Sequence, residues 1–519
     1  MPSASDFGVY LRPTAGTLSR AGQSVAGSAV RLVSAGLLAA ALSGCMVGPD
    51  FAPPKPPGVS DYLPPTNTVT TISASGVAAQ RLARGMSLPG EWWALFGSSY
   101  LNALVSRGLE YNADIKAQEA AIRAAQATAL AQRGALFPML NADFNSTRQK
   151  VPTESQSSNA ATGASIYSVH TAKLSATFVP DIFGGTRRLI EAAETQVVTE
   201  ELRREAVVLT MTSSIALAAI EEASQRGQIA ATQRLIDIQS QILGLLRRQE
   251  RAGQIGLTDV VVQETALAQA RLLLPPLEKQ LGRQRNLLAV LVGSFPSEGA
   301  AATFELKSFR LPRVLPLSLP ADLIRQRPDI RVAETAVQIA NAQVGVAIAN
   351  RLPQIKLSGE VGSAASALSK LFSGGTGFWL IAGDAMQPLF DGFALYYKQK
   401  AAEELLAQSV EQYRGVVLVA FQGVADALQA LQSDAKALSA AIEAEQAAGR
   451  SIELLRRQLE QGQISLPNLL TAQQAYLQTS LARVQAEAAR LADTVALFQA
   501  LGGGWWNRAV EVAEVRQQH

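Results

Sequence analysis

The chain has 519 residues, with 46 basic and 43 acidic side chains, a net charge of +3 and a pI of about 8.9. This balance, without a long basic run, gives no support for nucleic-acid binding. The single cysteine excludes an internal disulfide framework, and two histidines leave little for a histidine-based metal or catalytic site. Hydrophobic residues make up 48% of the chain and aromatic residues only 6%, which favours helices over a β-sandwich.

The single cysteine, Cys45, ends an apolar segment near the start of the chain. Arg31 precedes LVSAGLLAAALSG, which has the length and basic flank of a signal peptide and is too short for a spanning helix. The segment ends in Leu-Ser-Gly-Cys, the pattern of a bacterial lipobox. We therefore expect residues 1–44 to be a lipoprotein-type signal peptide and Cys45 to carry the lipid that anchors the protein. The alternative is a free cysteine buried in a short helix.

A proline-rich stretch follows the cysteine. Residues 49–65 read PDFAPPKPPGVSDYLPP, a proline density that excludes a helix and favours extended polyproline II. Residues 45–90 are therefore predicted to be a lipidated N-terminus and a tether.

The rest of the chain repeats itself. RRQERAGQIG at 247–256 aligns with RRQLEQGQIS at 456–465, with six of ten positions identical. Further upstream, an offset of 215 residues places Pro138 on Pro353. Prolines and glycines that keep register make a chance match between two alanine- and glutamine-rich helices a poor explanation.

This repeat divides the body into two copies of one unit. The predicted domains are the first structural repeat at 91–300, an inter-repeat linker at 301–318, the second repeat at 319–506 and a C-terminal tail at 507–519.

Each copy is expected to begin with a helix and continue with two strands. The helices are predicted over 101–136 and 323–351, each ending before a proline. Apolar and polar residues then alternate with period two at 140–145, 173–178 and 355–361, which is typical of strands with one apolar face. The polar, glycine- and serine-rich segments between strands, 149–165 and 363–377, are expected to be exposed loops.

Very long proline-free stretches follow the strands, at 181–274 and 389–466. Each predicts a long helix and a helical hairpin, with tips at 250–259 and 459–468 and with Thr258 and Ser465 as candidate N-caps. Two heptad seams on the first helix indicate neighbours on both sides, as in a closed ring of helices. The seams consist of Leu235, Ile238, Ile242 and Leu245, and of Ile229, Ile236 and Leu243.

Four strands per chain cannot close a membrane barrel alone, because even small barrels have about eight strands. An open sheet edge in hydrocarbon leaves backbone N–H and C=O groups unpaired. The strands must therefore close with those of other chains, and three copies would supply twelve.

Five motifs together resemble the TolC-like outer-membrane factors, in the lipoprotein branch called NodT-type. They are CMVGPDFAPP at 45–54, EWWALFGSSYLNALVSRGLEYNADI at 91–115, LPADLIRQRPDIRVAE at 319–334, PLFDG at 388–392 and ALGGGWW at 500–506.

The resemblance implies an α+β membrane protein of TolC-like fold. In such a trimer, four strands per chain form a shared twelve-stranded β-barrel in the outer membrane, and long helices form a periplasmic α-helical barrel. The implied function is passive conduction of small toxic molecules in a tripartite efflux system associated with multidrug resistance. The implied partners are a periplasmic adaptor protein, an inner-membrane efflux pump and outer-membrane lipid, with no cofactor.

The resemblance also implies two kinds of site at the hairpin tips. The periplasmic gate would involve Asp259, Asn468 and Thr471. Thr471 stands where the family pattern has aspartate, and because threonine is neutral, a gate selective for cations is not expected from this position. Candidate adaptor-docking residues come from both tips: Gly253, Gln254, Leu257, Gly462, Gln463 and Leu466.

Two other classes of protein agree less well with the sequence. An enzyme is disfavoured because the chain has no glycine-rich phosphate loop, HExxH, GxSxG or CxxC motif, so no catalytic residue and no metal ligand is predicted. A lipid-anchored periplasmic helical scaffold or adaptor without a barrel is the alternative, and the alternating strands argue against it.

Overall fold

The structure is a computed structural model that describes residues 46–56, 58–64, 71–72, 78–150, 166–298 and 303–508, with residues 71–72 described by backbone only. The predicted signal peptide, Cys45 and residues 509–519 of the predicted tail lie outside these residues. The described chain divides into two compact units, and each contains parts of both repeats. Unit 1 consists of residues 46–48, Leu136–Arg188 and Gly345–Gly392, and unit 2 of Pro49–Ala135, Leu189–Val344 and residues 393–508.

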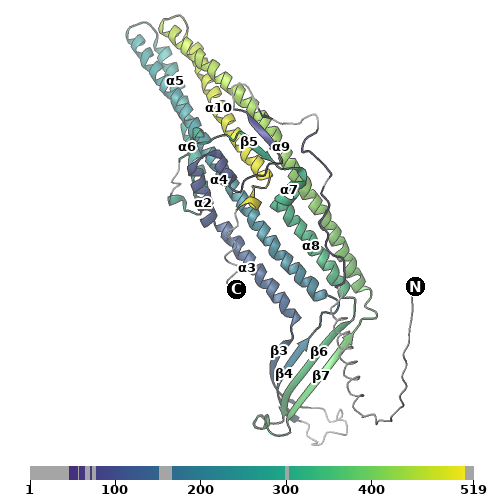
Figure 1. Ribbon diagram of the computed structural model, residues 1–519. Coiled ribbons are helices and arrows are strands. Elements are labelled where there is room, and N and C mark those ends of the chain that lie inside the picture. The colour runs from purple at the N-terminus through teal and green to yellow at the C-terminus, as the bar shows by residue number, and fades with distance from the viewer. Residues whose placement is uncertain are drawn as a thin grey trace, which may run out of the picture. The chain divides into compact units, whose positions relative to one another are not determined.

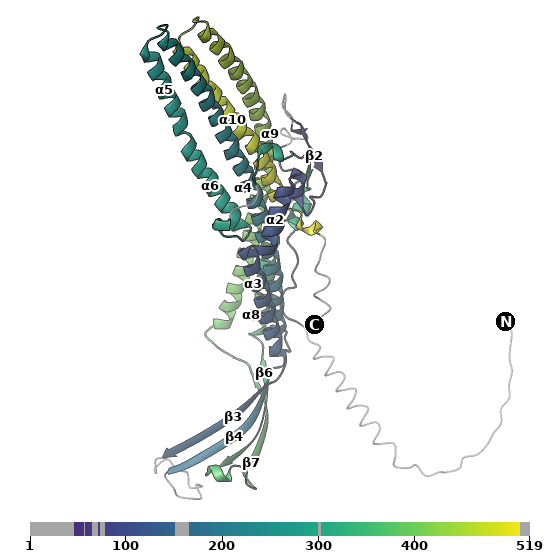
Figure 2. The same ribbon diagram turned by 90° about the vertical axis from the view of Figure 1, so that its left-hand side faces the viewer.

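Unit 1 contains an antiparallel four-stranded sheet. Its order is β3 (Met139–Lys150), β4 (Ile166–Phe178), β6 (Gln354–Ala365) and β7 (Gly377–Met386). The strands form a single curved layer (Figure 2). Two strands thus come from each repeat, as the sequence predicted. Strands β3, β4 and β6 are longer than the alternating stretches that indicated them, and no alternating stretch indicated β7.

The two faces of this sheet differ in polarity. Leu174 on β4 lies opposite Val361 on β6, and both side chains are exposed. Their neighbour Lys173 points to the other face, where its Nζ lies 2.9 Å from the Glu360 carboxylate. An exposed apolar face and a charged opposite face are the arrangement of a barrel wall with lipid outside and water inside. Within the described residues, β3 and β7 each lack a partner strand on their outer side.

Unit 2 is built mainly from helices. Figure 1 shows the two long helices, α4 and α9, each beside the helix that follows it along the chain. Both contain 67 residues, about 100 Å at 1.5 Å per residue. The helices are α2 (Ser99–Tyr111), α3 (Ala113–Arg133), α4 (Gly185–Arg251), α5 (Leu257–Leu272), α6 (Leu274–Leu291), α7 (Pro320–Gln326), α8 (Pro328–Ala349), α9 (Ala394–Glu460) and α10 (Leu466–Ala500).

The first predicted helix of each repeat is in fact two helices. Asn112 separates α2 from α3 because its backbone is extended and its Oδ1 accepts hydrogen bonds from the Asp114 and Ile115 N–H groups. In the second repeat, Pro328 forces Arg327 into an extended conformation, which ends α7 and begins α8. The predicted single helices at 101–136 and 323–351 were therefore wrong at these points.

A small second sheet was not predicted. Strand β2 (Gln80–Arg84) pairs in parallel with β5 (Val314–Leu317), and β1 (Thr71–Ile72) pairs with the other edge of β2. The predicted inter-repeat linker and the predicted tether thus each supply strands to one sheet. Alternation is too short over these strands to indicate them in the sequence.

Three of the five motifs that indicated the family, at 91–115, 319–334 and 500–506, meet in the core of unit 2. The ring of Phe498 packs against Trp92 and Phe96, with ring centroids 5.7 Å and 6.2 Å apart. The Trp505 indole N–H donates to the Gln326 carbonyl at 2.6 Å. Gly504 has φ 71°, and a Cβ there would lie 2.3 Å from a backbone oxygen, so only glycine fits. These motifs are therefore core-packing motifs.

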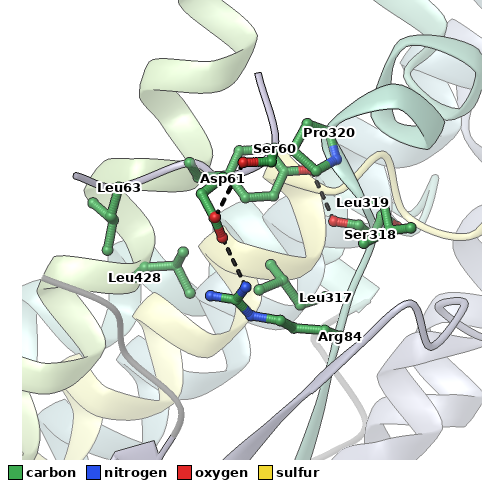
Figure 3. Close-up of a pocket in the computed structure, with 10 residues that line it drawn as sticks. Ser60, Asp61, Leu63, Arg84, Leu317, Ser318, Leu319, Pro320 and Leu428 are labelled. Carbon is green, nitrogen blue, oxygen red and sulfur yellow. Dashed lines mark hydrogen bonds and ion pairs between the residues drawn. The ribbon is translucent and has the colours of Figure 1, made fainter. Parts of the chain in front are cut away.

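The proline-rich segment is bound to the helices instead of forming a free tether. The Tyr62 hydroxyl donates to the Ser318 carbonyl at 2.9 Å, and the Tyr62 ring packs against Phe421. Next to it, Asp61 pairs with Arg84 at 2.8 Å (Figure 3). Burial raises the pKa of the Tyr62 phenol above its usual value, so the hydroxyl stays neutral and can donate this hydrogen bond. The proline content predicted an extended backbone, but the composition of the segment does not predict the contacts of Tyr62 and Asp61 with the rest of unit 2.

Among the residues that the structure describes, two helices, α4 and α9, contain an apolar window long enough to cross a membrane by length and composition alone. In α4, 61% of that window is buried inside the structure, which is the environment of a core helix.

A partly buried acidic pair, Asp434 and Asp493, provides a pH-dependent prediction. Burial, followed by a hydrogen bond with Asp493, raises the pKa of Asp434 from 3.8 to about 7, and the Arg490 charge opposes this shift. Because the folded state holds this proton more tightly than the unfolded state, the destabilising effect appears as pH rises above about 4 and is complete above about 7. Asp434→Asn should therefore raise the melting temperature at pH 8 and change it little at pH 4. Asp426→Asn, at an exposed site on the same helix, is the control, and equal shifts at both pH values would contradict the prediction.

Candidate functional site at the helical hairpin tips

Both hairpin tips end their first helix with the same glycine turn. At the first tip, Gly253 has φ 72°, its N–H donates to the Glu250 carbonyl, and the Gln254 N–H donates to the Gln249 carbonyl. This is a Schellman motif, in which a left-handed residue satisfies the last carbonyls of a helix. The second tip repeats it, with Gly462 at φ 71° and the same bonds 209 residues later. The tips predicted at 250–259 and 459–468 thus have glycine because the turn requires it.

The second helix of each hairpin begins at equivalent residues. Ser465 is the N-cap of α10, as predicted, although its side chain makes no capping hydrogen bond. The N-cap of α5 is Gly256, so the prediction of Thr258 was wrong. The helix begins earlier because Gly256 adopts the extended cap conformation, with φ −80° and ψ 158°, which puts Thr258 inside the first turn.

The two hairpins pack into one hydrophobic core, called here the tip bundle. Both predicted heptad seams of α4 contribute, so this helix does contact neighbours on two sides. The buried members of the tip bundle are Leu235, Ile236, Ile242, Leu243, Leu246, Val260, Leu267, Ala270, Ile452, Leu459, Leu466, Leu469 and Leu477.

Three buried glutamines interrupt the apolar side chains of the tip bundle. Gln239, Gln263 and Gln473 are 4%, 0% and 0% exposed. The Gln263 amide donates to the Gln239 carbonyl at 3.2 Å. Both polar atoms of the Gln473 amide, and the side-chain oxygens of the other two, have no hydrogen-bond partner in the described structure. These three glutamines, called here the glutamine layer, therefore lower the stability of the tip bundle.

Sequence reasoning missed the glutamine layer, although a signal was present. Gln239 lies between Leu235 and Ile242, and Gln473 lies between Leu469 and Leu477, at the spacing of core positions. A polar residue at such a position of a coiled coil sets the register of the helices and lowers stability.

The candidate docking residues differ between the two tips. Gly253, Gln254, Gly462 and Gln463 are all exposed, as a docking surface requires. The two repeat-equivalent leucines diverge, because Leu257 is 65% exposed and Leu466 is 4% exposed. Leu466 thus packs inside the tip bundle, whereas Leu257 is open to a partner.

The candidate gate residues lie in the first turns of the two returning helices. Asp259 is half-buried at the N-terminus of α5, where the helix dipole stabilises its charge. Asn468 and Thr471 are exposed on α10, and the Thr471 hydroxyl donates to the Pro467 carbonyl at 3.0 Å. No hydrogen bond or ion pair links these three side chains within one copy of the described chain. If they form a constriction, symmetry-related copies must bring them together.

The arginines before the tips form two kinds of ion pair, one between helices and the other within a single helix. Arg247 on α4 pairs with Glu264 on α5 at 2.6 Å, which ties the two arms of the first hairpin together. Arg456 and Arg457 pair with glutamates of their own helix, at 3.3 Å and 2.7 Å. All of these pairs are exposed, and each contributes at most about 1 kcal/mol.

The described residues contain no group of three or more histidine, cysteine, aspartate or glutamate side chains that could hold a metal ion.

Both repeats match one family model, described as outer membrane efflux protein, over residues 104–294 and 319–503. The chain belongs to the outer membrane efflux protein family. The predicted resemblance to TolC-like outer-membrane factors is thereby confirmed, and the chain is placed in the bacterial outer membrane as part of an efflux system.

Individual members of the outer membrane efflux protein family agree over nearly the whole chain. The probable efflux pump outer membrane protein TtgC of Pseudomonas putida is 28% identical over 92% of this chain and 96% of its own length. The outer membrane protein OprJ of Pseudomonas aeruginosa is 29% identical over 91% and 96%.

Solved structures confirm the α+β channel fold. The outer-membrane channel OprN superposes with a TM-score of 0.78 at 23% identity, over 89% of this chain and all of that one. The open state of the Neisseria gonorrhoeae MtrE outer membrane channel gives a TM-score of 0.74 at 25% identity, over 89% and 99%.

Proposed function

We propose that this protein is the trimeric outer-membrane duct of a tripartite efflux system, anchored by lipid at Cys45. The observation that carries the proposal is the four-stranded sheet of unit 1, whose two edge strands have no partner within the described chain. In hydrocarbon those edges must be paired, and three copies closing edge to edge would form a twelve-stranded barrel.

The helices of unit 2 support the same assignment. Two hairpins built from helices of 67 residues are suited to form a tube when three copies assemble, giving twelve helical arms. The tube would conduct passively, as the resemblance to TolC-like outer-membrane factors implies. Small toxic molecules would enter from an adaptor and an inner-membrane pump, with the exposed tip residues Gly253, Gln254, Leu257, Gly462 and Gln463 as the docking surface.

The first test is native mass spectrometry together with planar-bilayer conductance of the detergent-extracted protein. A trimer that conducts supports the duct. A monomer without conductance would contradict it and would favour the lipid-anchored helical scaffold. Heat-modifiable migration on gels separates these outcomes independently, because a closed barrel resists detergent until it is heated.

The proposed gate gives a separate prediction. Thr471→Asp would place three carboxylates at the constriction of a trimer, so the reversal potential under a salt gradient should shift toward cation preference. Thr265→Asp is the matched control, because Thr265 is also an exposed helical threonine that donates to the carbonyl four residues earlier. An unchanged reversal potential in Thr471→Asp would show that Thr471 does not line the pore.

A further inference from the structure

The residues immediately after Cys45 are held by a buried arginine of unit 1. The Val47 N–H donates to the Phe183 carbonyl at 3.1 Å. Arg188 on α4 donates through Nε to the Val47 carbonyl at 3.3 Å and through Nη2 to the Gly48 carbonyl at 3.4 Å. Arg188 is only 1% exposed, and a buried guanidinium requires acceptors. The peptide backbone of residues 46–48 supplies two of them.

Glycines provide the space for this contact. Gly184 has φ 77°, and a Cβ there would lie 2.6 Å from the Met46 side chain. Gly48 has φ 96°, and a Cβ there would lie 2.5 Å from the Gly345 Cα. Gly345 is itself on α8, where a Cβ would lie 2.9 Å from the Arg188 side chain. Three backbone positions on three separate segments are therefore glycine because the chain segments touch.

The second repeat lacks the same arrangement. Helices α4 and α9 have equal lengths and begin 209 residues apart, so Gly184 corresponds to Phe393 and Arg188 to Tyr397. The upstream offset of 215 makes Leu130 the equivalent of Gly345. Tyr397 and Leu130 are 66% and 64% exposed, and no described N-terminal residue covers them. The arrangement is therefore a specific feature of the first repeat and does not follow from the repeat fold itself.

We propose that Gly184, Arg188 and Gly345 form a binding seat for the backbone of residues 46–48, which fixes the attachment point of the membrane anchor to the strand-bearing unit. The proposal rests on the lipid anchor proposed at Cys45, the residue that directly precedes Met46 in the sequence. Arg188 acts here as a positioning residue. The seat recognises backbone carbonyls and one glycine, so it depends little on the side chains at positions 46 and 47.

A consequence for the anchor follows. An unbound, extended proline-rich linker of some fifteen residues would place an acyl chain tens of ångströms from the fold. The seat prevents this separation, because the bound segment begins one residue after Cys45. The next residue, Pro49, is also held, since the Asn341 amide donates to its carbonyl at 2.8 Å. The lipid is thus confined to the membrane beside the strands.

The test is hydrogen exchange with mass spectrometry on the full-length, detergent-extracted protein. In Arg188→Ala, amide exchange in residues 46–56 should become at least about tenfold faster, while β4 and the rest of α4 keep their protection. Gly184→Ala leaves the guanidinium in place and should give the same local effect. Arg203→Ala is the matched control, because Arg203 lies on the same helix and is half exposed.

The possible outcomes test the binding seat and the lipid anchor at Cys45 separately. Unchanged exchange of residues 46–56 in both Arg188→Ala and Gly184→Ala would overturn the seat. Faster exchange spread evenly over α4 and β4 would also overturn it, because it would indicate a general structural role. The intact mass of the N-terminal peptide reports lipid at Cys45 independently. An unmodified peptide would reject the proposed anchor and with it the anchoring role, whereas local release in a lipidated protein would support both.

Discussion

Gln473→Leu is expected to strengthen the tip bundle and to reduce spontaneous opening of the channel. The Gln473 amide is fully buried and both of its polar atoms lack a partner in the described structure. Leucine has a similar volume and no group that needs a hydrogen bond, so the substitution should stabilise the local packing by about 2 kcal/mol. If opening requires the two hairpins to separate, this corresponds to roughly a thirtyfold lower population of the open tip.

Two measurements check this result. Hydrogen exchange at the tip peptides should slow in Gln473→Leu, and single-channel recordings should show a lower open probability with the same open conductance. Gln474→Leu is the control, because Gln474 is the neighbouring exposed glutamine of the same helix. A faster tip exchange in Gln473→Leu would show that the amide is satisfied by a bound water and stabilises the closed tip.

Leu466→Ala and Leu257→Ala should have different effects, although the two leucines are repeat equivalents: the first should destabilise the tip bundle, and the second should weaken adaptor binding. Leu466 is buried in the tip bundle, so truncation should cost about 3 kcal/mol of local stability and increase the open probability. Leu257 is mostly exposed, so truncation should change tip exchange by less than about 0.5 kcal/mol. Its expected effect is weaker binding of the adaptor, since an exposed aliphatic side chain at the docking surface is lost.

The pair forms its own control. Tip hydrogen exchange should respond to Leu466→Ala only, and adaptor affinity, measured with the cognate adaptor on immobilised trimer, should fall in Leu257→Ala while the tips stay closed. Equal exchange in the two variants would mean that trimer assembly buries Leu257 as deeply as Leu466. Normal adaptor affinity in Leu257→Ala would remove that residue from the docking surface.

Much of the fold could be predicted because it is encoded in local or periodic signals. The hairpin tips follow from Gly253 and Gly462, since a Schellman turn needs a left-handed residue and glycine adopts it without strain. The strands follow from alternation, because one face meets lipid and the other meets water. Both patterns depend only on residues close together in the sequence, so they can be recognised without knowledge of tertiary contacts.

Features that depend on distant contacts could not be predicted. The pairing of β2 with β5 joins segments more than 200 residues apart, and neither strand is long enough to show a period. Leu257 and Leu466 follow the similar segments GQIG and GQIS, yet one is exposed and the other buried, because burial depends on tertiary packing. The cap at Asn112 could not be predicted, because an asparagine within a helical pattern becomes a cap only if its side chain accepts the next N–H groups, which the structure shows here.

The unpaired edges of β3 and β7 have a consequence for genetics. In the proposed trimer every barrel contains three copies of each edge, so one subunit that cannot pair leaves a breach that the other two cannot close. In a cell that makes equal amounts of normal and edge-defective chains, random assembly leaves only about one trimer in eight wholly normal. Mutations at these edges should therefore be dominant, whereas mutations that merely unfold the free chain should be recessive.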